Sequence, residues 1–235
     1  MVIDLKTLYG AEATEQQKRY EELSAYFAEE FGDVNALSYF SAPGRTEVGG
    51  NHTDHNNGKV LAAAVNLDVI AAVKKTENGV IRLKSVGFPM DTVDTADLNV
   101  QEAEKERSAS LIRGVCARLK ALGYEVGGFD AVTTSRVLKG SGLSSSAAFE
   151  VLVVTILSHL YNNDAIDPVE AAQISKFAEN VYFGKPSGLL DRVWAALRRW
   201  TLKIFPRRRL RRSILTSTVT AMRCASSIRA GTMPT

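Results

Sequence analysis

A glycine–serine turn carries the strongest chemical signal in the sequence, in the stretch "KGSGLSSSAAFE" from Lys139. A strand-like segment leads into two glycines, and a helix-like segment follows among three serines. Glycine lets backbone N–H groups surround a ligand closely, and a helix N-terminus adds unpaired donors and about half a positive charge. An ordinary tight turn with serine capping is the alternative. The predicted phosphate-binding residues are Gly140, Ser141, Gly142, Leu143, Ser144, Ser145 and Ser146.

A second polar segment, "SAPGRTEVGGNHTDHNNG" from Ser41, is rich in glycine and asparagine, which is typical of a loop. Its side chains both donate and accept hydrogen bonds, which suits a small polyhydroxylated ligand. A solvated hairpin loop is the alternative. A zinc site at His52, Asp54 and His55 is a weaker one, because no partner cluster with metal-ligand spacing occurs elsewhere in the sequence.

Together, in this order and about 90 residues apart, the two motifs resemble the small-molecule kinases that act on galactose, homoserine, mevalonate and phosphomevalonate. "GSGLSSSAA" resembles the ATP-binding motif of the whole group, whereas "APGRTEVGGNHTDHNNG" resembles the signature of galactokinases. The resemblance extends through "AENVYFGKPSGLLD" and covers about residues 15–191. It implies the α+β fold of the N-terminal domain of these kinases, with a mixed, largely antiparallel sheet, and transfer of phosphate from ATP to the C1 hydroxyl of galactose.

The resemblance also implies roles at the matching positions. Asp191 falls where the family has an aspartate that would accept the proton of the C1 hydroxyl. Arg45 matches an arginine that stabilises the charge developing on the transferred phosphate. Ser146 and Glu179 match the ligands of a Mg²⁺ ion that accompanies ATP. The implied sugar-binding residues are Asn51, His52, Thr53 and Asp54.

Three residues depart from the galactokinase signature: Glu47, Asn51 and His55 stand where the family has asparagine, glutamate and tyrosine. The amide of Asn51 still forms hydrogen bonds to hydroxyls, so galactose stays the expected substrate while the sugar preference is open. A kinase for another sugar, such as N-acetylgalactosamine, and a non-catalytic sensor that binds galactose and ATP are the alternatives. An activity assay on a panel of sugars identifies a kinase for another sugar. Calorimetry combined with that assay identifies a sensor that binds without turnover.

The elements that position these residues follow from periodicity and capping signals. The helix predicted from Glu12 has an apolar stripe and ends at Gly32. A helix over "SASLIRGVCARLKALG" has Ser108 or Ser110 as its cap, a long buried helix follows the serines, and Asp167 caps a further helix that starts with proline. The predicted strands are "LSYFSAPGR", which runs into a loop at Pro43–Gly44, two apolar runs around Asn66–Leu67–Asp68, "GVIRLKSVG" and "GFDAVTTSRVLKG".

Composition places the chain among reduced, cytoplasmic enzymes. No apolar run approaches the roughly 20 residues that span a bilayer, and no secretory signal is visible at the N-terminus. The two cysteines form neither a disulfide framework nor a metal motif. The resemblance implies that the chain binds galactose and ATP, and we expect it to be a monomer with no nucleic-acid or membrane partner.

Charge divides the chain at Asp191. Residues 192–235 hold ten Arg and one Lys and neither Asp nor Glu, whereas the other 18 basic and 26 acidic residues give residues 1–191 a net charge of −8. We interpret residues 192–235 as an aberrant, disordered basic tail read out of frame, with the C-terminal kinase domain missing and little activity in the chain. The competing interpretation is a basic arm, "RRRLRR", for nucleic acid or an acidic membrane surface. The nucleotide sequence around codon 191 distinguishes the two.

Overall fold

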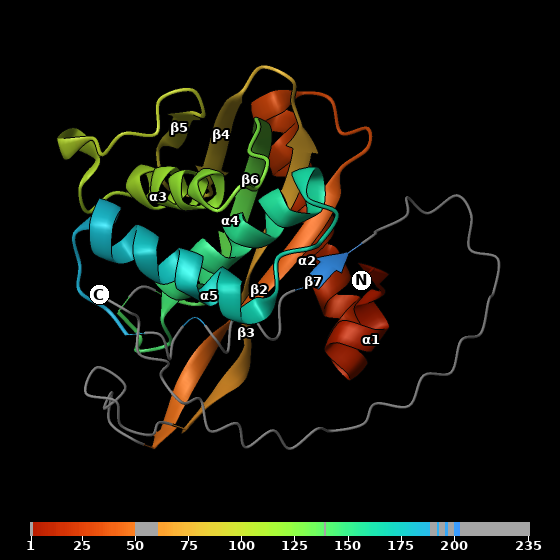
Figure 1. The fold of residues 1–235 in the computed structure, drawn as a ribbon. Coiled ribbons are helices and arrows are strands. Elements are labelled where there is room, and N and C mark those ends of the chain that lie inside the picture. Colours follow the sequence, from red (N-terminus) through yellow and green to blue (C-terminus); the bar gives the residue numbers. More distant parts are fainter. Residues whose placement is uncertain are drawn as a thin grey trace.

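A seven-stranded mixed sheet forms the centre of the protein (Figure 1), in the strand order β1-β7-β2-β3-β6-β4-β5. The computed structural model describes residues 2–49, 61–138, 140–188, 192, 196 and 200–202. The strands are β1 (Val2–Ile3), β2 (Ser38–Gly49), β3 (Leu61–Lys75), β4 (Val80–Ser85), β5 (Met90–Asp94), β6 (Phe129–Ser135) and β7 (Trp200–Leu202). Neighbouring strands are antiparallel except for the pairs β1–β7 and β4–β6. The predicted mixed, largely antiparallel sheet is therefore confirmed.

Helices cover both faces of this sheet (Figure 1). On one face lie α1 (Leu5–Tyr9) and α2 (Ala13–Phe31), joined by the 3₁₀ turn Gly10–Glu12. On the other lie α3 (Ser108–Ala121), α4 (Ser145–Tyr161) and α5 (Pro168–Phe177), which continues into the π-helical turn η4 (Ala178–Phe183). A short 3₁₀ turn, η3 (Glu102–Glu104), precedes α3. None of the helices described is long and apolar enough to cross a bilayer.

The apolar stripe of α2 packs as the periodicity predicts. Tyr20, Leu23 and Phe27 are at most 1% exposed and contact the sheet residues Ile70 and Ala72. Burying each large apolar side chain contributes about 1.5–3 kcal/mol relative to leaving it exposed. The stripe therefore fixes α2 against β3.

The opposite face holds the larger core, and α4 lies at its centre. Eleven residues of α4 are buried, eight of them apolar, which confirms the predicted long buried helix. Asp167 caps α5, since its Oδ1 accepts hydrogen bonds from the backbone N–H groups of Val169 (2.8 Å) and Glu170 (3.1 Å). This cap is also as predicted.

Two local predictions were wrong. β2 does not end at Pro43–Gly44 but continues to Gly49, because a register shift between Pro43 and Arg45 accommodates the proline within the strand. No serine caps α3: the N-cap is Arg107, and the Ser110 hydroxyl donates to the Arg107 carbonyl oxygen at 2.7 Å. The two apolar runs around Asn66–Leu67–Asp68 form the single strand β3.

Five described residues belong to the basic segment 192–235. Arg192 and Ala196 are 1% exposed. The strand β7 lies between β1 and β2, where it pairs parallel to β1 and antiparallel to β2. The expected disorder does not extend to these five residues, and the out-of-frame origin of the segment stays a prediction.

We expect the Cys116 thiol to be unreactive in the native protein. It lies in the α3 core with no exposed surface, and burial raises the pKa of its thiol to about 12, whereas the thiolate is the reactive form. At about pH 8, N-ethylmaleimide should leave the Cys116 peptide unmodified by mass spectrometry and should label it fully in concentrated urea. Rapid native labelling of Cys116 would contradict this packing.

Candidate active site

The glycine–serine turn forms as the sequence predicts. Gly140 and Gly142 have φ angles of 80° and 76°, which glycine adopts at little cost. α4 begins at Ser145, and the Ser144 side chain makes no capping hydrogen bond to it. The uncapped N–H groups of a helix N-terminus and its partial positive charge favour an anion. The turn is therefore not an ordinary serine-capped one, and phosphate binding at this turn stays a prediction.

Arg45 on β2 holds the two sequence motifs together. Its backbone N–H donates to the Leu143 carbonyl oxygen at 3.1 Å, and its Nη1 donates to the Gly142 carbonyl oxygen at 2.9 Å. Arg45 is only 5% exposed. Strand β2 is therefore anchored, at Arg45, to the turn that precedes α4.

We expect Gly44→Ala to weaken this junction. A Cβ at Gly44 would lie 2.9 Å from the Leu143 carbonyl oxygen and 3.0 Å from Val137 Cγ1, so the strand and the turn would have to separate. Overpacking of this kind costs about 1–3 kcal/mol. Urea denaturation should show that loss, and calorimetry should show weaker binding of ATP.

Val48→Ala is the matched control, because Val48 lies on the same strand and is 61% exposed. It should behave like the wild type in both measurements. Unchanged stability and ATP affinity in Gly44→Ala would mean that β2 does not contact the turn this closely.

Ser146 and Glu179, the predicted metal ligands, lie side by side. The Ser146 hydroxyl donates to Glu179 Oε1 at 3.0 Å. Glu179 lies in the π-helical turn η4 and is 2% exposed. Turns of this type occur frequently at functional sites.

Arg192 occupies the other side of Glu179. Its Nη2 forms an ion pair with Glu179 Oε2, its Nε donates to Glu150 Oε2 at 2.8 Å, and its Nη1 donates to the Gly188 carbonyl oxygen at 2.7 Å. Burial disfavours the charge of Arg192, but Glu150 and Glu179 outweigh that effect, so the pKa of Arg192 lies above its usual range. The Glu179 carboxylate, which was expected to hold Mg²⁺, is thus paired with the Arg192 guanidinium. With this pairing in place, Ser146 and Glu179 do not fit a divalent cation.

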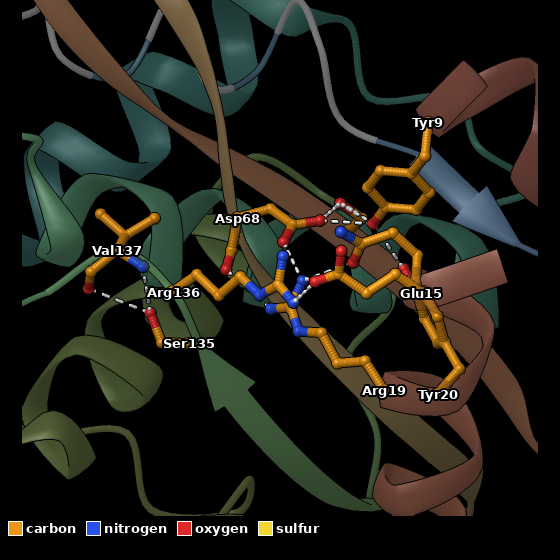
Figure 2. A network of polar contacts seen from close by, with 10 residues as sticks. Tyr9, Glu15, Arg19, Tyr20, Asp68, Ser135, Arg136 and Val137 are labelled. Atoms are coloured by element: carbon orange, nitrogen blue, oxygen red, sulfur yellow. Dashed lines mark hydrogen bonds and ion pairs between the residues drawn. The ribbon is translucent and has the colours of Figure 1, made fainter. Parts of the chain in front are cut away.

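A buried polar network centred on Asp68 supports the first part of the β2–β3 hairpin (Figure 2). Arg19 from α2 and Tyr9 from α1 reach the Asp68 carboxylate, and the Ser41 hydroxyl donates to it at 2.6 Å. Burial, followed by the charge of Asp68, raises the pKa of Tyr9 well above its usual value, so the phenol stays protonated and donates. The network joins both N-terminal helices to β2 and β3.

The same network reaches the strand that leads into the glycine–serine turn. The backbone N–H of Arg136 donates to the Asp68 carbonyl oxygen at 2.9 Å, and the Arg136 side chain donates to Glu15 Oε1 at 2.8 Å. Figure 2 shows Arg136 beside Ser135 and Val137 at the end of this chain of contacts. The Ser135 hydroxyl bonds to the Val137 backbone at 3.0 Å.

Several predicted site residues lie outside the described part of the chain. These are Asn51, His52, Thr53, Asp54 and Asp191. Their roles stay predictions, and so does the zinc alternative at His52, Asp54 and His55. Within the described ranges, no cluster of three or more His, Cys, Asp or Glu could hold a metal ion.

The sequence reasoning missed the three buried charged residues that form the two networks described above: Asp68, Glu150 and Arg192. Glu150 had a visible signal, because a lone carboxylate within the apolar run of a buried helix requires a partner. Asp68 interrupts two apolar runs in the same way. Arg192 had no such signal, since it opens a segment full of arginine.

Models of two protein families match the parts of the chain that carry the two motifs. The galactokinase galactose-binding signature matches residues 25–75, and the N-terminal domain of GHMP kinases matches residues 110–199. The crystal structure of the mevalonate kinase of Methanococcus jannaschii, 18% identical, superposes with a TM-score of 0.57 over 68% of this chain and 50% of that one. The fold and the turn thus define the class: the chain contains the N-terminal domain of a GHMP kinase.

Closer relatives identify the family within that class. The galactokinase of Lactococcus lactis subsp. lactis is 36% identical over 171 residues, which are 72% of this chain and 43% of the relative. The crystal structure of Lactococcus lactis galactokinase complexed with galactose is 32% identical, with a TM-score of 0.71 over 76% of this chain and 46% of that one. The chain belongs to the galactokinase family, and it spans about half the length of the curated relatives that it matches.

Proposed function

We propose that this chain carries the sugar- and nucleotide-binding region of a galactokinase, which transfers the γ-phosphate of ATP to the C1 hydroxyl of galactose. The observation that carries the proposal is the contact between Arg45 and the turn residues Gly142 and Leu143. It joins the galactose-binding signature to the phosphate-binding turn, 97 residues further along the chain. A hydroxyl held by one motif would therefore lie near a phosphate held by the other.

In the proposed reaction, the protein positions the two substrates and stabilises the charge that develops on the transferred phosphate. The turn and the start of α4 would bind the nucleotide phosphates through backbone N–H groups, and Arg45 would offset the charge that develops on the transferred group. The sugar oxygen would form a bond to the γ-phosphorus while the bond to the β–γ bridging oxygen breaks, and Asp191 would take the hydroxyl proton. A base of this kind contributes about 10²–10⁴-fold.

Calorimetry and product analysis on the purified chain test the proposal. Galactose and ATP should each bind, and galactose 1-phosphate should be detected by mass spectrometry. The analogue 1-deoxygalactose is the matched control, because it lacks only the attacking hydroxyl: it should bind and yield no product. A chain that binds neither galactose nor ATP would refute the assignment.

A sensor that binds both molecules without turnover is the second candidate, and the Arg192–Glu179 ion pair favours it. Binding of galactose and ATP with no galactose 1-phosphate would support the sensor. A sugar panel that includes N-acetylgalactosamine tests the preference left open by Glu47, Asn51 and His55. Binding of Mg²⁺ together with ATP, a cytoplasmic location and a monomeric state stay predictions.

A further inference from the structure

We propose that Arg192 acts as a built-in cation that occupies the carboxylate Glu179 and prevents the protein from binding a divalent metal ion there. The inference rests on the proposed function only in taking Glu179 as the carboxylate expected to hold the ion. Its evidence is the arrangement of Glu150, Glu179 and Arg192, all of which are at most 2% exposed.

The guanidinium is fully engaged in this position. Its three nitrogens contact Glu150, Glu179 and the Gly188 carbonyl oxygen. A planar guanidinium matches the geometry of carboxylates and cannot lose its charge in a protein. Arg192 is therefore a cation at any pH at which the protein is folded.

A metal ion at Glu179 would meet both a steric and an electrostatic obstacle. Mg²⁺ requires near-octahedral oxygen coordination at about 2.0–2.1 Å and retains several water ligands. Glu179 Oε1 already accepts from Ser146, and Oε2 is paired with Arg192. An ion bound to either oxygen would lie next to a like charge in a site with almost no solvent to screen it.

It follows that a divalent cation would reach this site only as part of a nucleotide complex and not as an ion bound to Glu179. Mg²⁺ alone should then change neither the melting temperature of the chain nor its affinity for galactose. The Arg192 guanidinium supplies a positive charge at Glu179, where a metal ion would otherwise bring one.

A double variant whose cluster has the same net charge as the wild-type cluster tests this inference. The wild-type cluster carries one positive and two negative charges. The double variant Arg192→Gln/Glu150→Gln carries only Glu179, so its net charge is the same. Any gain in metal affinity would then come from removing the guanidinium and not from a more negative site. Adding Glu179→Gln gives the control that lacks the carboxylate.

Mn²⁺ alone is the probe, measured by the electron paramagnetic resonance signal of the free ion, without nucleotide or sugar. We expect the double variant to bind Mn²⁺ about tenfold or more tightly than the wild type, and the triple variant to lose that gain. A folded double variant that binds Mn²⁺ no better than the wild type would overturn the inference.

Circular dichroism and a cooperative melting curve establish that each variant folds. If the double variant does not fold, Glu179→Gln in the otherwise wild-type chain decides the question. Unchanged Mn²⁺ affinity in that variant supports the inference, and a marked loss overturns it. Calorimetry with galactose on the same proteins tests the proposed function separately.

Discussion

Replacing Arg192 with leucine is expected to lower the free energy of unfolding by about 3–5 kcal/mol, because it leaves Glu150 and Glu179 buried without their shared cation. That loss is a large fraction of the roughly 5–15 kcal/mol by which domains are stable. Urea denaturation followed by far-UV circular dichroism measures it.

Two further variants isolate the cause. The triple variant Arg192→Met/Glu150→Gln/Glu179→Gln removes all three charges and should recover most of the stability, since uncharged replacements for a buried ion pair are often neutral. Arg113→Leu removes another arginine with two hydrogen bonds to a carboxylate, but its partner Glu104 is 20% exposed, so the loss should be smaller. A loss below about 1 kcal/mol in Arg192→Leu would show that Arg192 is not buried between the two carboxylates in solution.

Asp68→Ala is expected to have a comparable effect, again about 3–5 kcal/mol. The change leaves the Arg19 guanidinium, whose side chain is 10% exposed, without its carboxylate, and it leaves the hydroxyls of Tyr9 and Ser41 without their acceptor. Because the network joins α1 and α2 to the sheet, both helices should also become more protease-sensitive. Urea denaturation and limited proteolysis measure the two effects.

Asp33→Ala is the control for Asp68→Ala. Asp33 also forms an ion pair, with Lys74, but its side chain is 54% exposed. Exposed pairs contribute little to stability, so its denaturation curve should lie close to that of the wild type. Equal losses in the two variants would contradict the distinction between the buried network and the surface pair.

The two buried clusters also clarify how the proposed site is supported. Asp68 links the N-terminal helices to the strand that leads into the glycine–serine turn. Arg192 links α4, through Glu150, to the π-helical turn that carries Glu179. Asp68 pairs with Pro43, two residues before Arg45, and α4 begins just after the turn that Arg45 contacts. We therefore expect changes in either cluster to alter ligand binding as well as stability.

Local signals were sufficient for most of the elements. The apolar stripe of α2, the Asp167 cap of α5 and the two glycines of the turn each depend on residues within a few positions of one another. The errors arose where a neighbouring strand decided the outcome. Pairing with β3 carries β2 through Pro43, which local propensity places in a loop.

The sequence by itself determined the glycine–serine turn, the helices around it and the resemblance to galactokinases, because each of these depends on residues close together in the chain. Only the tertiary structure decided which distant groups meet. Arg45 reaches Gly142, and Arg192 enters between Glu150 and Glu179, since burial in a low-dielectric core makes an unpaired charge too costly to leave alone. No spacing rule in the chain encodes that pairing, so Glu179, one of the two metal ligands implied by the resemblance, became a partner of Arg192.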